Sequence, residues 1–149
     1  MVKIRLAEPK DLPDIIELCV LHAAYERAEY DANGKEAALK KHFFGTRPSA
    51  FCLIAEENGK PVGYATYMLQ FSTWDADFYL YMDCLFVREE ARSRGIGAQL
   101  TDEIKTEARK SDCRLIQWQT PDFNERAIKF YKRIGATSKS KERFFLEAE

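Results

Sequence analysis

The sequence predicts a mixed α/β fold, in which helices cover the faces of a mixed sheet, and three observations predict it. Short apolar segments with strand composition occur in both halves of the chain. Asn58-Gly59, between two of them, signals a hairpin because both central positions of that turn need a positive φ. From Ile96, between Gly95 and Gly97, apolar residues recur every four positions, which is typical of a helix with one buried face. The predicted order is β-α-α-β-β-β-α-β-α-β, and we expect one domain over residues 1–149.

The first half of the chain predicts four strands and two helices. Asp11 is expected to cap the first helix, with Pro13 in its first turn. The expected elements are a strand over 2–6, a helix from residue 12, a helix over 36–44, and strands over 51–56, 62–71 and 78–87.

In the second half of the chain, apolar residues recur at helical spacing. The apolar stripe of its first helix consists of Ile96, Leu100, Ile104 and Ala108. A strand is expected over 115–120, and a second helix from an Asn124 cap through Ile134 to Gly135, a typical residue just beyond a helix. Residues 143–146 predict a final strand.

Composition narrows the function classes. The chain has 23 Lys and Arg against 24 Asp and Glu, a formal net charge of −1, which argues against a dedicated nucleic-acid binder. The cysteines include no CxxC pair and no zinc-like cluster, so we expect buried, reduced thiols and no metal. No signal peptide or membrane-spanning run is recognisable, so we expect a cytoplasmic protein with no membrane partner.

The most informative motif is Arg92-Ser93-Arg94-Gly95-Ile96-Gly97, between a predicted strand and a predicted helix. Glycines there expose backbone N–H groups in one direction, and the helix N-terminus and two arginines add positive charge. These features favour a phosphate or pyrophosphate ligand. The spacing matches neither a P-loop nor a dinucleotide-binding motif. A strand-to-helix turn with incidental arginines is the alternative.

In this setting, Arg92-x-x-Gly95-x-Gly97 resembles the acetyl-CoA pyrophosphate loop of the GNAT N-acetyltransferases. The segment from Asn124 to Ala136 resembles the second CoA-contacting segment of that family. Within the family, the sequence is most similar to the spermidine/spermine (diamine) acetyltransferases. The resemblance implies a mostly antiparallel sheet, acetyl-CoA as cosubstrate, direct transfer in a ternary complex, and a homodimer. The CoA-binding residues that it implies are Leu85, Phe86, Val87, Arg92, Ser93, Arg94, Gly95, Ile96, Gly97, Ala98, Asn124 and Lys132.

Two residues are predicted to be catalytic. Asp83 interrupts an apolar, aromatic strand and is a candidate to take the proton of an attacking amine, directly or through water; a solvated surface carboxylate is the alternative. The diamine acetyltransferases have acidic residues at positions 83 and 84, whereas this chain has Cys84, whose thiol could exchange with a thioester. The resemblance implies that Tyr131 is the general acid for the departing thiolate; core packing is the alternative.

The acceptor is expected to be a small cationic amine, such as a diamine, a polyamine or a lysine-like amine. An acidic site with aromatic walls suits a cation through charge pairing and cation–π contact. The predicted acceptor-binding residues are Tyr25, Glu26, Trp74, Asp83 and Cys84. Ser72 departs from the acidic residue of the diamine enzymes, and His22 is expected to have a surface or capping role. The alternatives are an acetyltransferase for protein amines and a CoA-binding module without turnover.

Overall fold

A computed structural model describes all residues of the chain, Met1–Glu149, which form two compact units, Met1–Gln119 and Thr120–Glu149. The strands of the first unit are β1 (Val2–Leu6), β2 (Phe51–Glu57), β3 (Lys60–Ser72), β4 (Asp77–Val87) and β5 (Ile116–Gln117). Its helices are α1 (Leu12–Tyr25), α2 (Lys35–Phe44) and α3 (Ile96–Lys110), with short 3₁₀ turns at Pro9–Asp11 and Glu89–Ala91. The second unit contains α4 (Glu125–Arg133). No helix is long and apolar enough to cross a membrane.

The five strands form one sheet in the order β1-β2-β3-β4-β5. The first three pairs are antiparallel and the β4–β5 pair is parallel, so the predicted mixed, mostly antiparallel sheet is confirmed. The β2–β3 turn is the predicted hairpin: Asn58 has a φ of 52° and Gly59 a φ of 77°. That pair of left-handed residues matches the right-handed twist of the two strands.

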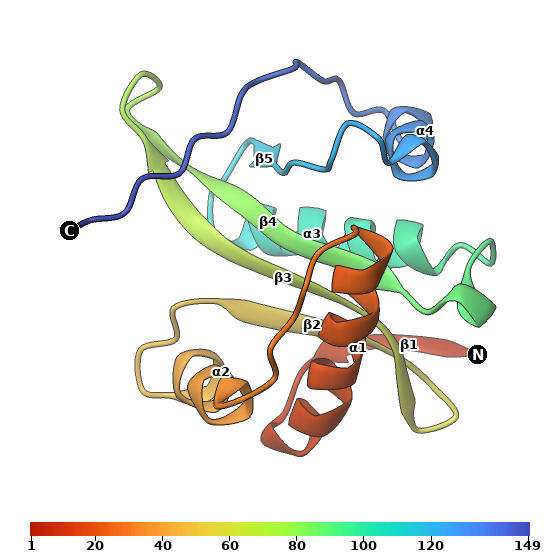
Figure 1. Cartoon of the computed structure of the whole chain (residues 1–149). Coiled ribbons are helices and arrows are strands. Elements are labelled where there is room, and N and C mark those ends of the chain that lie inside the picture. The colour runs from red at the N-terminus through yellow and green to blue at the C-terminus, as the bar shows by residue number, and fades with distance from the viewer. The chain divides into compact units, whose positions relative to one another are not determined.

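Each face of the sheet is covered by helices, as Figure 1 shows for α1 and α3. Alternate side chains of β2 divide between the two cores: Leu53 and Ala55 pack on the α3 side, Cys52 and Ile54 on the α1 side. The predicted α3 stripe is confirmed, since Ile96, Leu100, Ile104 and Ala108 are all at most 3% exposed. Full burial of each branched side chain contributes roughly 1.5–3 kcal/mol, so this stripe holds α3 on the sheet.

A bulge interrupts the pairing of β3 with β4. Thr66 faces Cys84 and Tyr67 faces Met82, so Asp83 is an extra residue with no partner across the ladder. The bulge changes which face each side chain takes. Leu80 and Met82 pack in the α3 core, whereas Cys84 and Phe86 pack on the α1 side.

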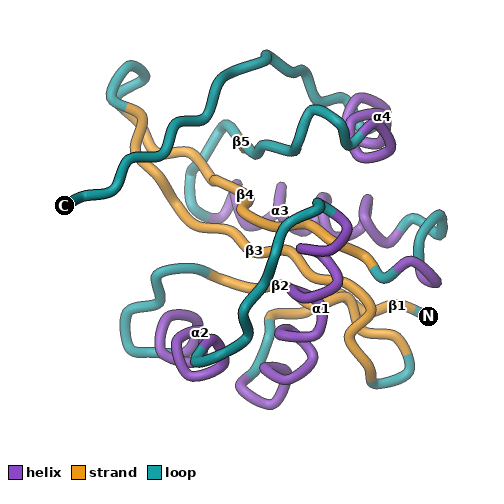
Figure 2. Tube along the Cα trace, in the orientation of Figure 1, coloured by secondary structure: helices purple, strands orange, loops and turns teal.

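Two strand predictions need correction. The final strand expected over 143–146 is wrong, because no regular element follows α4, and Figure 2 draws that stretch as loop. Phe144, Phe145 and Leu146 are at least 80% exposed. A strand is stable only when another strand accepts its hydrogen bonds, and no strand of this chain pairs with the segment. The strand expected over 115–120 is confined to Ile116–Gln117 for the same reason, since β4 pairs with only those two residues.

Two predicted side-chain caps are also absent. Asp11 lies at the N-cap of α1 but makes no cap bond; its carboxylate instead accepts hydrogen bonds from the Arg5 guanidinium, at 2.8 and 2.9 Å, and from the Glu8 N–H. Asn124 lies at the N-cap of α4 without a side-chain cap bond, and its Nδ2 donates to the Thr120 hydroxyl. In both cases another polar group lies within reach and competes with the helix N–H groups.

Candidate active site

The loop from Arg92 to the start of α3 has the backbone that its motif predicts. Ser93 (φ 64°) and Gly95 (φ 81°) are left-handed, and Gly95 is the N-cap of α3. No side chain caps this helix, and its first turn contains no acidic residue. Its first N–H groups are therefore available to an anion, with the partial positive charge of the helix end behind them. The residues at this end of α3 fit a phosphate group.

The two arginines of the motif have different partners. Arg94, half exposed, forms a two-bond ion pair with the Glu57 carboxylate at 2.9 Å. A pair open to solvent contributes little, so Arg94 can exchange that carboxylate for a phosphate at small cost. The Arg92 side chain is instead held by other residues of the protein. Its Nε donates to the Val87 carbonyl at 2.8 Å, and its guanidinium lies over the rings of Tyr25 and Phe86, at 4.6 and 5.1 Å.

The carboxyl-terminal half of β4 is an open sheet edge. β5 pairs only with Leu80 and Tyr81, so no strand lies beside Leu85 or Val87 on that side. Such an edge can receive an extended ligand as an added strand. The Val87 carbonyl already accepts the hydrogen bond from Arg92.

The bulge places Asp83 and Cys84 beside the end of α1. Asp83 is exposed, while Cys84 is half buried and packs in the cluster that contains Cys19 and Tyr25. The Cys84 thiol lies 4.0 Å from an Asp83 carboxylate oxygen. All four cysteines are free thiols, as expected, although only Cys52 and Cys113 are fully buried.

The surface or capping role expected for His22 is wrong. Its side chain is 13% exposed; Nδ1 lies 2.8 Å from the Tyr64 hydroxyl and Nε2 lies 2.9 Å from Glu26 Oε2. Burial lowers the pKa of His22, but hydrogen bonds with Cys84 and Glu26 outweigh it and raise the pKa to about 9. Sequence reasoning missed this pair, although the spacing of four residues between His22 and Glu26 on one helix was a usable signal.

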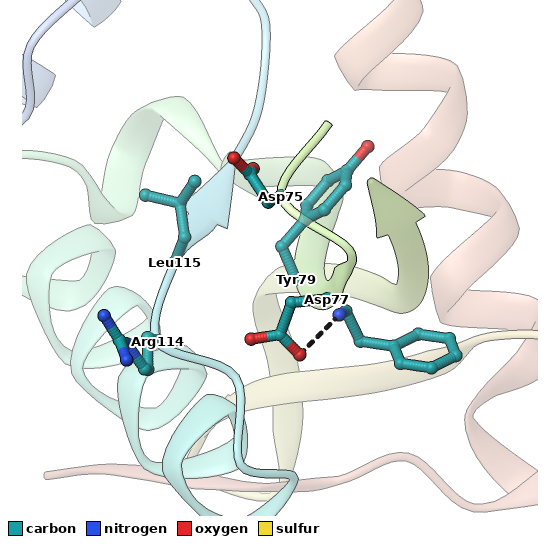
Figure 3. Close-up of a pocket in the computed structure, with 6 residues that line it drawn as sticks. Asp75, Asp77, Tyr79, Arg114 and Leu115 are labelled. Atoms are coloured by element: carbon teal, nitrogen blue, oxygen red, sulfur yellow. Dashed lines mark hydrogen bonds between the residues drawn. The ribbon is translucent and has the colours of Figure 1, made fainter. Parts of the chain in front are cut away.

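The structure brings together Tyr25, Glu26, Asp83 and Cys84 of the predicted acceptor site, but not Trp74. Trp74 lies in the β3–β4 turn and is 99% exposed. Nearby, a hollow of about 520 Å³ is lined by Asp75, Asp77, Phe78, Tyr79, Arg114 and Leu115 (Figure 3). Along β4, the lining residue Tyr79 is four residues from Asp83, roughly 13 Å in a strand, and Asp83 does not line the hollow.

Tyr131, Lys132 and Asn124 belong to the second unit. Tyr131 is half buried, and its ring centroid lies 5.5 Å from that of Phe130. The predicted end of this helix is confirmed: Gly135 has a φ of 98°, its N–H bonds the Lys132 carbonyl, and the Ala136 N–H bonds the Tyr131 carbonyl. The roles of these residues toward CoA stay predictions.

Comparison with known proteins agrees with this geometry. The model of the acetyltransferase (GNAT) family matches residues 15–136. Thialysine N-epsilon-acetyltransferase of Bos taurus is 32% identical over 143 residues, 91% of this chain and 84% of that protein. Spermidine/spermine N(1)-acetyltransferase-like protein 1 of Homo sapiens is 31% identical over 94% of this chain, which spans only 21% of that longer protein.

Solved structures show the same fold. An integron cassette protein from V. cholerae is 29% identical, with a TM-score of 0.76 and coverage of 99% of this chain and 93% of that one. A protein from Bacillus halodurans described as a transcriptional regulator has a TM-score of 0.84 at 20% identity, with coverage of 99% and 100%, and supports the fold alone. With a family model that matches most of its length and named acetyltransferases as relatives, the chain belongs to the GNAT family of acetyltransferases.

Proposed function

We propose that this acetyltransferase moves the acetyl group of acetyl-CoA to the primary amine of a small cationic acceptor, by direct transfer in a ternary complex. The bulge in β4 is the observation that carries the proposal. It presents the exposed Asp83 carboxylate at an open strand edge, on the side of the sheet where Tyr25 and Glu26 end α1. Two carboxylates beside an aromatic ring suit an ammonium group.

The acceptor must lose a proton before it attacks. An alkylammonium has a pKa of about 10.4, so its neutral form costs about 4.6 kcal/mol at pH 7. Asp83 is the group proposed to accept that proton, directly or through one water, because its exposed carboxylate is reachable by a ligand. The nitrogen then forms its bond to the acetyl carbonyl carbon and releases its second proton to water, and the bond from that carbon to the CoA sulfur breaks.

The departing thiolate needs a proton, and we assign this step to Tyr131, whose phenolate then regains a proton from water. A phenol with an ordinary pKa near 10 is protonated at neutral pH and can donate to a thiolate whose conjugate acid has a pKa of about 8.5. The assignment rests on the family motif from Asn124 to Ala136. Arg94 and the first N–H groups of α3 would hold the pyrophosphate.

The acceptor class is supported by the names of the relatives, of which one is a thialysine N-epsilon-acetyltransferase and another is a spermidine/spermine N(1)-acetyltransferase-like protein. A homodimer and a cytoplasmic location belong to the same proposal, and they rest on family resemblance and on sequence composition. Light scattering after gel filtration tests the dimer.

The test of function is thiol release from acetyl-CoA with a panel of diamines, polyamines, thialysine, lysine and short peptides. We expect a strong preference for one free cationic amine. Activity on peptides with none on free amines would favour a protein acceptor. Tight CoA binding without turnover of any amine would favour the binding module.

Three variants test the assigned residues. Asp83→Asn is expected to lower kcat about 100-fold, while the matched Asp102→Asn, on the exposed surface of α3, keeps the parent rate. Tyr131→Phe should lower kcat by a similar factor, with the Kd for CoA unchanged. Cys84→Ala tests for an acetyl-thiol intermediate on the enzyme, because full turnover in this variant would exclude one.

A further inference from the structure

His22, in the last turn of α1, has a partner on each ring nitrogen. Nδ1 lies 2.8 Å from the hydroxyl of Tyr64, a residue of β3 that is 1% exposed. Nε2 lies 2.9 Å from Glu26 Oε2. The imidazole also stacks on Phe86 of β4, with ring centroids 5.1 Å apart and planes at 22°. Because both ring nitrogens have partners, the imidazole cannot turn without losing both hydrogen bonds.

Glu26 follows α1 directly, at its C-cap. A helix C-terminus carries partial negative charge, so a carboxylate there is unfavourable unless a donor or a cation holds it. His22, one helical turn earlier, is that donor, and it contacts Oε2 only. The Glu26 side chain is 33% exposed. One carboxylate oxygen is thus held from the protein side, and the other, Oε1, is left for a ligand.

The arrangement is satisfied in both protonation states of His22. In the imidazolium, both nitrogens donate, and the Tyr64 oxygen accepts. In the neutral ring, Nε2 still donates to Glu26, and Nδ1 accepts from the Tyr64 hydroxyl. Since hydrogen bonds with Cys84 and Glu26 raise the pKa of His22 to about 9 despite its burial, the donor that Glu26 keeps is charged at neutral pH.

We infer that His22 is a positioning residue of the acceptor site: it holds the Glu26 carboxylate so that Oε1 receives the ammonium of the acceptor, and Tyr64 holds His22. The inference rests on the proposed function, in which Glu26 binds the acceptor. His22 acts through Glu26 and does not itself touch the acceptor. The titratable and charged groups around His22 are Cys19 and Glu26 on and after α1, Tyr64 on β3, Asp83 and Cys84 on β4, Arg92 beyond Phe86, and Tyr30 and Lys35 beyond Cys19.

Steady-state kinetics with varied acceptor provide the first test. In His22→Leu, we expect the acceptor KM to rise about tenfold, the loss of one charge-assisted hydrogen bond, with kcat and the acetyl-CoA KM within twofold. His22→Gln should recover part of the loss, because its amide can still donate to Glu26. Tyr64→Phe should change the acceptor KM in the same direction. His42→Leu is the matched control, since His42 is exposed on α2.

A double-mutant cycle separates positioning from a general structural role. Glu26→Gln removes the charge that His22 holds, so His22→Leu should have little further effect on the acceptor KM in that background. Two effects that simply add, or an unchanged acceptor KM in both His22 variants, would overturn the inference.

A ring-proton NMR titration gives a readout that needs no turnover. The pKa of His22 should fall in Glu26→Gln, and addition of a diamine should move the resonances of His22 but not those of His42. If these responses occur in a protein that acetylates no amine, the proposed function fails and the inference about His22 and Glu26 survives. If Glu26→Gln leaves the pKa of His22 unchanged, the inference fails whatever the activity.

Discussion

The ion pair between Arg5 and Asp11 makes the sharpest stability prediction. Asp11 is 3% exposed and accepts two hydrogen bonds from the Arg5 guanidinium, at 2.8 and 2.9 Å, and one from the Glu8 N–H. Arg5 also donates to Glu56, at 2.9 and 3.0 Å. The pair joins β1 to the start of α1. Asp11→Asn keeps the shape of the side chain and removes its charge.

The magnitude follows from burial and from the partner that remains. Removal of one member of a buried ion pair costs about 3–5 kcal/mol when the other charge is left without compensation. In Asp11→Asn, Arg5 keeps its ion pair with Glu56, and the Arg5 side chain is 14% exposed. The loss of stability should therefore lie near or below the lower end of that range. We expect about 2–3 kcal/mol in the free energy of unfolding, which for a chain of this size lowers Tm by roughly 5–10 °C.

Urea unfolding followed by circular dichroism measures the loss, with Asp14→Asn as the matched control in the first turn of the same helix. The control should lose less than about 1 kcal/mol, the range of a helix-dipole interaction. The pH dependence gives a second check. The hydrogen bond from Arg5 holds the pKa of Asp11 below its ordinary 3.8, so the pair's contribution is present above pH 3.8 and is lost as pH falls through the lower, folded value. Equal stability of the two variants at pH 7, or a gap that does not close on acidification, would refute the reasoning.

Three further outcomes are expected. Gly95→Ala should lower the free energy of unfolding by about 1–2 kcal/mol and raise the acetyl-CoA KM, because Gly95 has a φ of 81°. The cost comes from the backbone alone, since an added Cβ would meet no atom within 4 Å. Urea unfolding that matches the parent would contradict this. Arg94→Ala should raise the acetyl-CoA KM several-fold, and added salt should raise this KM in the parent protein. The variant should leave Tm nearly unchanged, since the Arg94–Glu57 pair is open to solvent. A large fall in Tm would show that the pair is structural. The extra stabilisation that comes from the charge on His22 should be complete below pH 6.5 and lost as pH rises through about 9, while the hydrogen bond from neutral Nε2 to Glu26 remains. A urea midpoint gap between parent and His22→Leu that widens on alkalinisation would be inconsistent with this loss.

Local patterns of the sequence were enough for much of the fold. The α3 stripe repeats every four residues, and a helix with that pattern stays in place by burying the stripe against the core. Asn58-Gly59 predicted its hairpin because the left-handed backbone is a property of the two residues themselves. The uncapped, glycine-containing start of α3 was likewise readable from Arg92 to Gly97.

The candidate site was only partly readable, and β4 shows why. Strict alternation would place Leu80, Met82, Cys84 and Phe86 on one face of the sheet. The bulge at Asp83 moves the last two to the other face, and no local pattern marks it, because a bulge depends on the register with β3. The residues that the bulge brings beside α1 could therefore be proposed individually but not assembled.

The sequence by itself determined the elements whose cause is local: the amphipathic helices, the hairpin turn, the glycine loop and the family to which they point. Only the tertiary structure decided which polar groups meet. Arg5 takes Asp11 away from its expected capping role, and Tyr64, 42 residues from His22 along the chain, turns an expected surface histidine into a half-buried partner of Glu26. The physical reason is that a hydrogen bond or an ion pair goes to whichever group the packed chain brings within about 3 Å, and separation in sequence does not encode that distance.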